Sequence, residues 1–303
     1  METSPPTRAG FFHRPYLLLT LTVLFWSGNV VLGRAVRAEV PPVALAFCRW
    51  IGATLLVSWA ALPHVRREIS VILEHWRILL VYSAVGIAIF NTLLYLGLQT
   101  TTAINGALIQ SAMPVLIVFF SFFLYGERLT RGQSAGVLIS LAGAALLVSR
   151  GDPAVFLAME FRPGDLLVFV AVICYAAYSA LLRLRPPLHP LSFLWTTFVT
   201  GSILLLPFFL WEQASGRTLT ATPTTLLAVA YVAVFPSILS YLFFNRGVEL
   251  VGPNRAGLFI HLIPVFGTLL AILLLGEAFQ LFQGAGAALI LAGIAMVNRF
   301  RRR

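Results

Sequence analysis

The chain has 303 residues, of which 59% are hydrophobic and only 11% are charged, and its formal net charge is +10. This balance excludes an ordinary soluble domain, because no soluble core could bury so much apolar surface. The basic residues are all arginines, and they fall mainly between apolar segments, where positive charge sets membrane orientation. We therefore predict an integral membrane protein with no nucleic-acid partner.

The chain contains ten apolar segments near the length of about 20 residues that a helix needs to cross a bilayer core. The fifth and tenth are the shortest. In chain order the predicted spans are residues 16–33, 43–62, 78–98, 103–124, 134–149, 165–182, 191–211, 224–244, 256–275 and 281–297. The first follows Arg8 and Arg14, as the apolar part of a signal peptide would. It has no obvious small-residue cleavage site, and we interpret it as a retained span.

Arginine is distributed unevenly between the two sides of the predicted spans. With the amino terminus inside, fifteen arginines fall on the cytoplasmic side and five on the opposite side, while Arg49 lies within a span. Cytoplasmic connections of membrane proteins carry the excess of positive charge. We therefore predict a multi-pass protein of the bacterial inner membrane with both termini in the cytoplasm. Its basic terminal cluster would contact anionic lipid of the bilayer.

The two halves of the sequence resemble one another. An offset of 150 positions aligns 14 identical residues in the 51 positions from 97 to 147 without a gap. These identities include Pro114 with Pro264. Each half contains five spans, and an odd number inverts the second half in the membrane. We predict an all-α integral membrane fold of ten transmembrane helices in two inverted five-helix repeats, 16–150 and 164–298, with a cytoplasmic tail at 1–15 and a basic tail at 299–303.

Four motifs resemble those of the drug/metabolite transporter superfamily, in its ten-helix members built from two EamA-type repeats. They are Phe25-Trp26-Ser27-Gly28-Asn29, Phe47-Cys48-Arg49-Trp50, Ala112-Met113-Pro114 with Gly126-Glu127, and Leu262-Ile263-Pro264 with Gly276-Glu277. The resemblance covers nearly the whole chain and is greatest to YddG-type exporters, which implies efflux of aromatic and other neutral amino acids. Thr197 stands where the second half would carry a counterpart of Arg49, so any role of this arginine is not repeated.

Polar side chains at membrane depth are costly unless they face a cavity or one another. Asn91 and Tyr95 are four residues apart, as are Tyr241 and Asn245, so each pair shares a helix face. An aromatic cavity with few charges suits a small amphipathic solute. The alternative is that these groups pack helices or form interfacial belts. The predicted cavity residues are Trp26, Asn29, Arg49, Asn91, Tyr95, Tyr175, Tyr178, Ser179, Tyr241, Asn245 and His261.

Two of these residues have specific alternatives. Arg49 could hold a substrate carboxylate, or it could reach a headgroup or lock helices through backbone carbonyls. His261 could couple protons to transport, or it could be a plain hydrogen-bonding histidine. Within the predicted spans, no Asp or Glu is obviously placed to support a proton relay.

Other residues have predicted structural roles. Pro114 and Pro264 occupy matching positions in the fourth and ninth spans, where a missing backbone hydrogen bond permits a kink, and each is a candidate hinge or a fixed bend. We expect Glu127 and Glu277 to stabilise the start of the next helix. The glycines of the fifth and tenth spans permit close helix contact.

These features predict a secondary transporter that exports small neutral metabolites, most of all amino acids including aromatic ones, by alternating access around a central cavity. Another cargo of the same superfamily, such as a purine, nucleotide sugar or drug, is the alternative, although a nucleotide sugar favours several cationic groups. The repeat disfavours a channel or receptor. No catalytic constellation stands out, and both cysteines, Cys48 and Cys174, lie in apolar segments. We therefore expect no enzyme activity, metal or cofactor.

Overall fold

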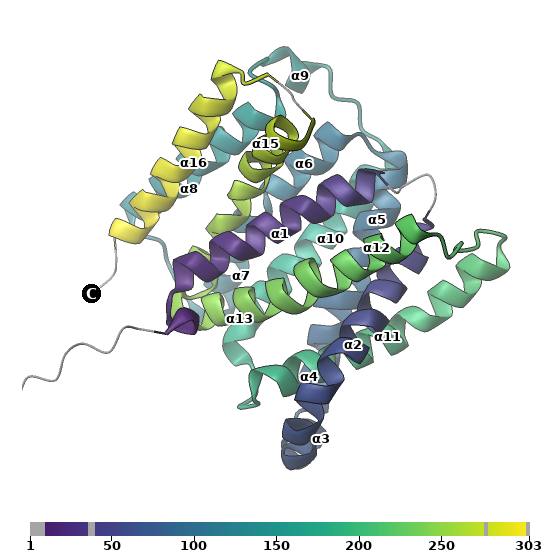
Figure 1. The fold of residues 1–303 in the computed structure, drawn as a ribbon. Helices are drawn as coiled ribbons and strands as arrows, with labels where there is room; N and C mark the ends of the chain where they lie inside the picture. The colour runs from purple at the N-terminus through teal and green to yellow at the C-terminus, as the bar shows by residue number, and fades with distance from the viewer. Residues whose placement is uncertain (1–9, 36–39, 276–277, 301–303) are drawn as a thin grey trace, which may run out of the picture.

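The computed structural model describes residues 10–35, 40–275 and 278–300, and all regular structure within these ranges is helical (Figure 1). In chain order the elements are η1 (Phe11–His13), α1 (Pro15–Ala35), α2 (Pro42–Arg67), α3 (Ile69–Glu74), α4 (Trp76–Ser83), η2 (Ala84–Ala88), α5 (Ile89–Thr100), α6 (Ala103–Ser111), α7 (Met113–Tyr125), α8 (Arg131–Val148), α9 (Ala154–Leu157), α10 (Pro163–Leu181), η3 (Leu182–Leu184), α11 (Pro190–Ala214), α12 (Pro223–Ala233), η4 (Val234–Leu239), α13 (Ser240–Val251), α14 (Pro253–Leu258), η5 (Phe259–His261), α15 (Leu262–Leu275) and α16 (Leu281–Arg299).

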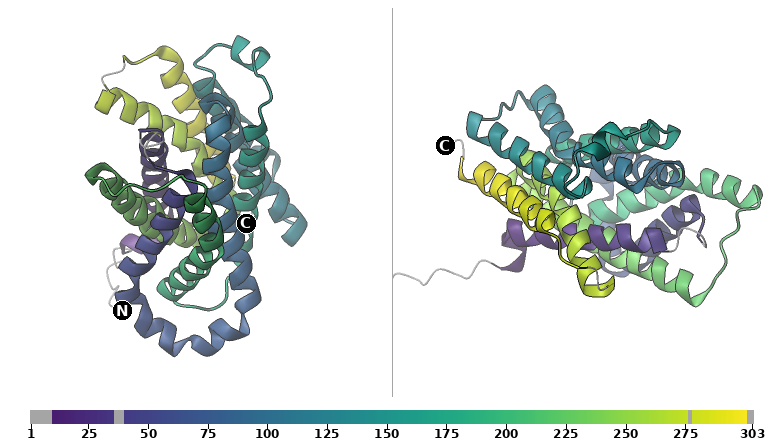
Figure 2. Two further views of the ribbon diagram at one scale, coloured as in Figure 1. Left: turned by 90° about the vertical axis from the view of Figure 1, so that its right-hand side faces the viewer. Right: turned by 90° about the horizontal axis from the view of Figure 1, so that it is seen from above.

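Eight helical runs are long and apolar enough to cross a bilayer, and they match the second to eighth and the tenth predicted spans. The first predicted span is α1, and the ninth is divided among α14, η5 and α15. Large apolar side chains cover the outside of the bundle: Trp59 is 82% exposed and Leu138 is 63% exposed. Such a surface is stable when the solvent is lipid. The short helix α3 protrudes at one end of the bundle and α9 at the other (Figures 1 and 2).

Helix starts follow from local chemistry. Proline occupies the first turn of several helices, where a missing N–H costs no helical hydrogen bond. The hydroxyls of Thr102, Thr130 and Thr222 each accept a hydrogen bond from the backbone N–H three residues later. Gly126 ends α7 with a φ of 64°, a left-handed conformation that favours glycine.

The long helices α2 and α11 cap one another. The buried carboxylate of Glu212, near the end of α11, accepts hydrogen bonds from Val43 N (3.2 Å) and Ala44 N (2.7 Å) at the start of α2. The carboxylate of Glu68, just after α2, accepts from His189 N (3.0 Å) just before α11. Each acid lies at the positive end of the partner helix. The two helices therefore run antiparallel.

The glycine-rich helices α8 and α16 pack backbone against backbone, as the sequence predicts. A Cβ added to Gly293 would lie 2.4 Å from Gly136 O, and one added to Gly143 would lie 2.7 Å from Gly286 O. No side chain fits at these contacts without separating the helices. This pair forms one side of the bundle, away from the cavity described below.

Four irregular segments interrupt the long runs. The π-helical segments η2 and η4 lie in the third and eighth predicted spans, 150 residues apart. The fourth predicted span breaks at Ala112, between α6 and α7, and the ninth breaks at η5. Pro114 follows the first break and Pro264 follows the second. Irregular backbone at membrane depth is tolerated where it is buried in protein or lines a cavity.

Candidate functional site

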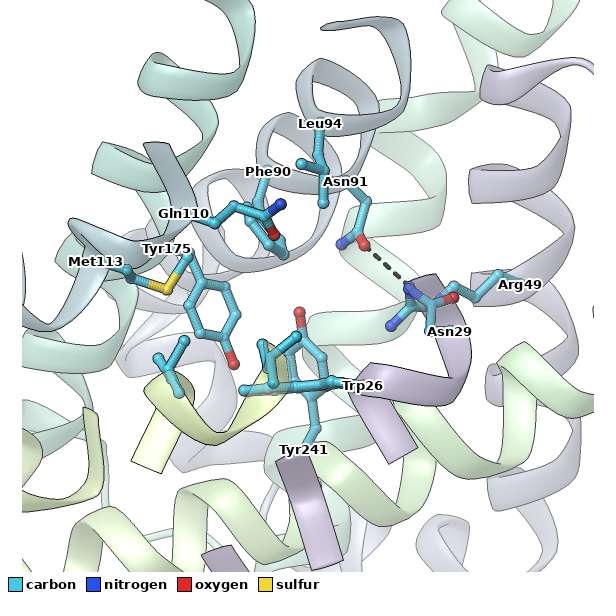
Figure 3. A pocket seen from close by; sticks show the side chains of 12 residues that line it. Trp26, Asn29, Arg49, Phe90, Asn91, Leu94, Gln110, Met113, Tyr175 and Tyr241 are labelled. Atoms are coloured by element: carbon cyan, nitrogen blue, oxygen red, sulfur yellow. Dashed lines mark hydrogen bonds between the residues drawn. The ribbon is translucent and has the colours of Figure 1, made fainter. Parts of the chain in front are cut away.

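A central cavity lies among helices from both ends of the chain (Figure 3). Its volume accessible to water is about 50 Å³, which is room for only a few water molecules. Its lining residues are Trp26 and Asn29 from α1, Arg49 from α2, Phe90, Asn91 and Leu94 from α5, Gln110 from α6, Met113 from α7, Tyr175 from α10, Tyr241 from α13, Ile260 from η5 and Ile263 from α15.

Arg49 is 2% exposed and is held by neutral acceptors. Its Nη1 donates to Asn91 Oδ1 (3.0 Å), the dashed bond in Figure 3, and to Tyr95 OH (3.1 Å). Its Nε donates to Ser237 Oγ (2.5 Å), and its Nη2 donates to Pro236 O (2.9 Å). No carboxylate within the described ranges forms a salt bridge with it. Arg49 therefore brings an unneutralised positive charge to the cavity wall.

The π-helical segments expose backbone carbonyls to side chains of other helices. Pro236 O in η4 accepts from Arg49 and also from Trp26 Nε1 (3.3 Å). Gly86 O in η2 accepts from Tyr241 OH (2.5 Å). A π-segment shifts the backbone hydrogen-bond register, which leaves carbonyls for such partners, and π-segments are frequent at functional sites. Both segments therefore help to position side chains of the cavity.

Aromatic rings form the other walls. Trp26 meets Tyr175 edge to face with ring centroids 5.5 Å apart, and Tyr175 meets Tyr241 at 6.2 Å. The hydroxyl of Tyr175 is buried and has no hydrogen-bond partner in the part of the chain that the structure describes. In Figure 3 the ring of Tyr175 faces the cavity from the side opposite Arg49. The cavity thus combines apolar faces with donors that remain available to a ligand.

The EamA-like transporter family matches the chain twice, at residues 13–149 and 162–299. The chain belongs to this family. It is 30% identical over 216 residues to the uncharacterized transporter YyaM of Bacillus subtilis, covering 71% of this chain and 70% of that protein. It is 27% identical over 289 residues to a Salmonella typhimurium protein named "Probable amino-acid metabolite efflux pump", covering 91% and 92%.

A solved crystal structure shares the fold, with a TM-score of 0.78 at 23% sequence identity, and the match covers 95% of this chain and 99% of the other. Together with the eight apolar helical runs, family membership makes this chain a multi-pass membrane transporter. The relatives are likewise named as transporters, in agreement with the expectation that the chain is not an enzyme.

Six of the eleven predicted cavity residues line the cavity of this EamA-like transporter. They are Trp26, Asn29, Arg49, Asn91, Tyr175 and Tyr241. Tyr95 lies directly behind them, where its hydroxyl contacts Arg49 and donates to Asn29 Oδ1 (3.3 Å). Its hydroxyl thus links the side chains of Arg49 and Asn29.

The other four predicted residues do not line the cavity. Tyr178 OH donates to Asn245 Oδ1 (3.0 Å), and Ser179 Oγ donates to the Tyr175 carbonyl (2.8 Å). His261 Nε2 lies 2.9 Å from Ser111 O, and its Nδ1 lies 2.7 Å from Ser140 Oγ. A carbonyl only accepts, so Nε2 carries the hydrogen. Both ring nitrogens thus have partners within the helix bundle.

The role expected for Glu127 is wrong. Its carboxylate pairs with Arg183 and accepts from Asn254 Nδ2 (3.1 Å). The start of α8 is capped instead by Thr130 and Gln133, which bond each other's backbone. Glu277 lies outside the described residues.

Sequence reasoning missed six lining residues, which are Phe90, Leu94, Gln110, Met113, Ile260 and Ile263. Gln110 could have been found, because it is an amide at membrane depth and lies four residues before Pro114. The apolar residues carry no comparable signal, since an apolar side chain at membrane depth faces lipid, helix or cavity equally well.

Proposed function

We propose that this protein is a secondary transporter that exports small, mostly neutral metabolites from the bacterial cytoplasm, with amino acids as the first candidates. The observation that carries the proposal is the cavity, where aromatic faces, amides and one arginine surround a space between helices from both parts of the chain. Such a lining suits an amphipathic solute with a polar end and an apolar end. A relative named as an amino-acid metabolite efflux pump supports the same cargo.

The proposed architecture is ten spans in two inverted halves, 16–150 and 164–298, between cytoplasmic tails at 1–15 and 299–303. Two separate matches to the same family support the two halves. The π-helical segments η2 and η4, which begin 150 residues apart, also support two related halves. So does the reciprocal capping of α2 and α11, in which an acid near the end of each helix accepts hydrogen bonds at the start of the other. Inverted halves around a midplane site are the usual architecture of alternating access.

The size of the cavity supports a transport cycle with moving helices. A space of about 50 Å³ is too small for an amino acid, since ligand pockets are typically about 300 Å³ or larger. A cargo of this size enters only if helices part. Pro114 and Pro264 remain the candidate hinges, because each follows a break in a run that borders the cavity.

Counterflow in proteoliposomes tests the proposal. Liposomes with purified protein are loaded with unlabelled tryptophan, methionine or threonine, and entry of the labelled compound is followed with and without a pH gradient. We expect faster entry than in protein-free liposomes, and the response to pH reports proton coupling. If a folded preparation exchanges none of the three, amino acids are not the cargo, and purines, nucleotide sugars and drugs are tested next.

A pair of tryptophan variants links any exchange to the cavity. Trp26→Phe keeps an aromatic ring but removes the Nε1 hydrogen bond to Pro236 O. Trp59→Phe makes the same change in α2 on a side chain that is 82% exposed. We expect a roughly three- to tenfold loss of exchange in the first variant and none in the second. If the two variants exchange the labelled compound equally fast, the transport path does not pass through this cavity.

A further inference from the structure

We infer that the cavity selects amphipathic carboxylates that carry a net negative charge, with the carboxylate held by Arg49. This inference rests on the proposed transport function, and it names organic anions as the preferred cargo in place of the neutral amino acids considered first. It predicts that a cargo bearing a carboxylate without an ammonium group binds better than the corresponding amino acid.

The first argument is the uncompensated charge of Arg49. A guanidinium does not lose its proton in a protein, so this 2% exposed side chain carries a full positive charge. Its four hydrogen bonds go to an amide, two hydroxyls and a backbone carbonyl, all of which are neutral. A buried charge of this kind is stabilised most by an opposite charge.

Buried acids in the described part of the chain are engaged elsewhere. Glu212 caps α2, and Asp165 accepts hydrogen bonds from Thr101, Asn105 and the backbone of Arg162. The cavity lining itself includes no acidic side chain in the described ranges. The missing negative charge is therefore one that a ligand can supply.

The second argument is the set of donors left over around the cavity. Four of the five N–H donors of Arg49 have partners among the described residues, which leaves one on Nη2. The Tyr175 hydroxyl is buried without a partner among the same residues. Both residues line the cavity, on opposite sides (Figure 3). A carboxylate, whose two oxygens accept about four hydrogen bonds, uses such donors.

The third argument separates an anion from a zwitterion. The ammonium group of an amino acid would bring a second positive charge next to Arg49, and the lining offers it only amides, phenols and aromatic faces. A carboxylate without an ammonium group gives a neutral pair with Arg49 and leaves no buried charge unpaired. Its apolar end would pack against Trp26, Phe90 and Tyr175.

The test uses three compounds that share a phenyl ring and chain length: 3-phenylpropionate, phenylalanine and 3-phenylpropanamide. Binding of labelled 3-phenylpropionate to the detergent-purified wild-type protein is measured in competition with the other two. Exchange in proteoliposomes follows at pH 8, with protein-free liposomes to correct for passive entry of the acid. We expect phenylpropionate to bind about tenfold more tightly than phenylalanine, and the amide to bind more weakly than both.

Two variants assign the effect to Arg49. In Arg49→Gln we expect phenylpropionate to lose about thirtyfold or more in affinity while the amide changes little. Arg77→Gln, which removes an exposed arginine of α4, should change neither. Because Arg49→Gln could fail to fold, the wild-type competition series is the deciding measurement.

The outcomes are distinguishable. Tighter binding of phenylalanine than of phenylpropionate overturns the inference but leaves an amino-acid carrier standing. Equal binding of the amide and the carboxylate also overturns it, and assigns Arg49 a structural role in holding neighbouring helices together by hydrogen bonds. Exchange of phenylpropionate without exchange of phenylalanine supports the inference and removes amino acids as cargo. If folded protein exchanges tryptophan, methionine or threonine but none of the three phenyl compounds, the inference is overturned and the proposed function stands. If it exchanges none of these six compounds, the inference is overturned together with the amino-acid cargo.

Discussion

Replacing Gly293 by alanine should destabilise the protein, because α16 meets α8 at this glycine. The added Cβ would lie 2.4 Å from Gly136 O and 2.7 Å from Ser140 Cβ. Favourable contacts between such atoms occur near 3.5–4.0 Å, so the two helices must separate by roughly 1 Å. The nearest atom belongs to the backbone and cannot rotate away.

The expected cost follows from two opposing contributions. Overpacking in a tight contact costs about 1–3 kcal/mol. Alanine in place of a helical glycine recovers about 0.5–1 kcal/mol. Because the clash is with backbone, the upper half of the overpacking range applies, and the net loss is about 1–2.5 kcal/mol, which corresponds to a decrease in Tm of roughly 2–10 °C.

Gly267→Ala in α15 is the matched control. No described atom outside its own helical turn lies within 4 Å of the position that its Cβ would take, so only the favourable helix contribution applies. We expect its Tm to stay unchanged or rise by about 2 °C. The measurement is thermal unfolding of both variants in one detergent, followed by intrinsic fluorescence. A Gly293→Ala protein as stable as the wild type would refute the close contact between α8 and α16.

Two further predictions concern the ends of α2 and α11. Glu212→Gln should lower the free energy of unfolding by about 2 kcal/mol, because an amide has only one oxygen to accept the two backbone N–H bonds. The exposed Glu74→Gln should leave the stability unchanged, and equal losses of stability in the two variants would contradict the cap. Burial and the stacked ring of His64 lower the pKa of His189 below its ordinary value of 6.5, so stability should fall as pH decreases below 6.5. His189→Asn keeps a side chain that can cap α11, and it should reduce the decrease in Tm between pH 7.5 and 5.5. If the decrease in Tm is the same as in the wild type, groups other than His189 cause it.

Much of the fold follows from the sequence because each span is a local property. Hydropathy alone located eight runs that the structure forms as long helices, and the glycines of α8 and α16 indicated close packing. The cap at Glu212 has no local signal, because its partners Val43 and Ala44 lie about 170 residues earlier in the chain. The partners of the π-helical segments likewise have no local signal, because Pro236 O accepts from Arg49 and Gly86 O accepts from Tyr241.

The candidate site was predictable only in part, because helix rotation decides which way a side chain points. Asn91 and Tyr241 correspond under the 150-residue offset, and both line the cavity. Tyr95 and Asn245 correspond as well, but Tyr95 supports Arg49, whereas Asn245 accepts from Tyr178 outside the lining. Polarity at membrane depth predicts that a side chain has a partner, but it does not predict whether that partner is a ligand or the protein.

Several polar side chains within the membrane-spanning helices donate hydrogen bonds to backbone carbonyls of the other proposed half. At each site a carbonyl in or directly beside an irregular segment of one half has a side chain of the other half as its partner. The pairs are Arg49 with Pro236, Tyr241 with Gly86, and His261 with Ser111. Separating the halves in hydrocarbon would leave each carbonyl unpaired at a cost of about 1–3 kcal/mol. Water satisfies the same groups, so the halves can part at low cost only where water enters. We therefore expect the cavity to open toward one aqueous side at a time, with the pairs on the closed side intact.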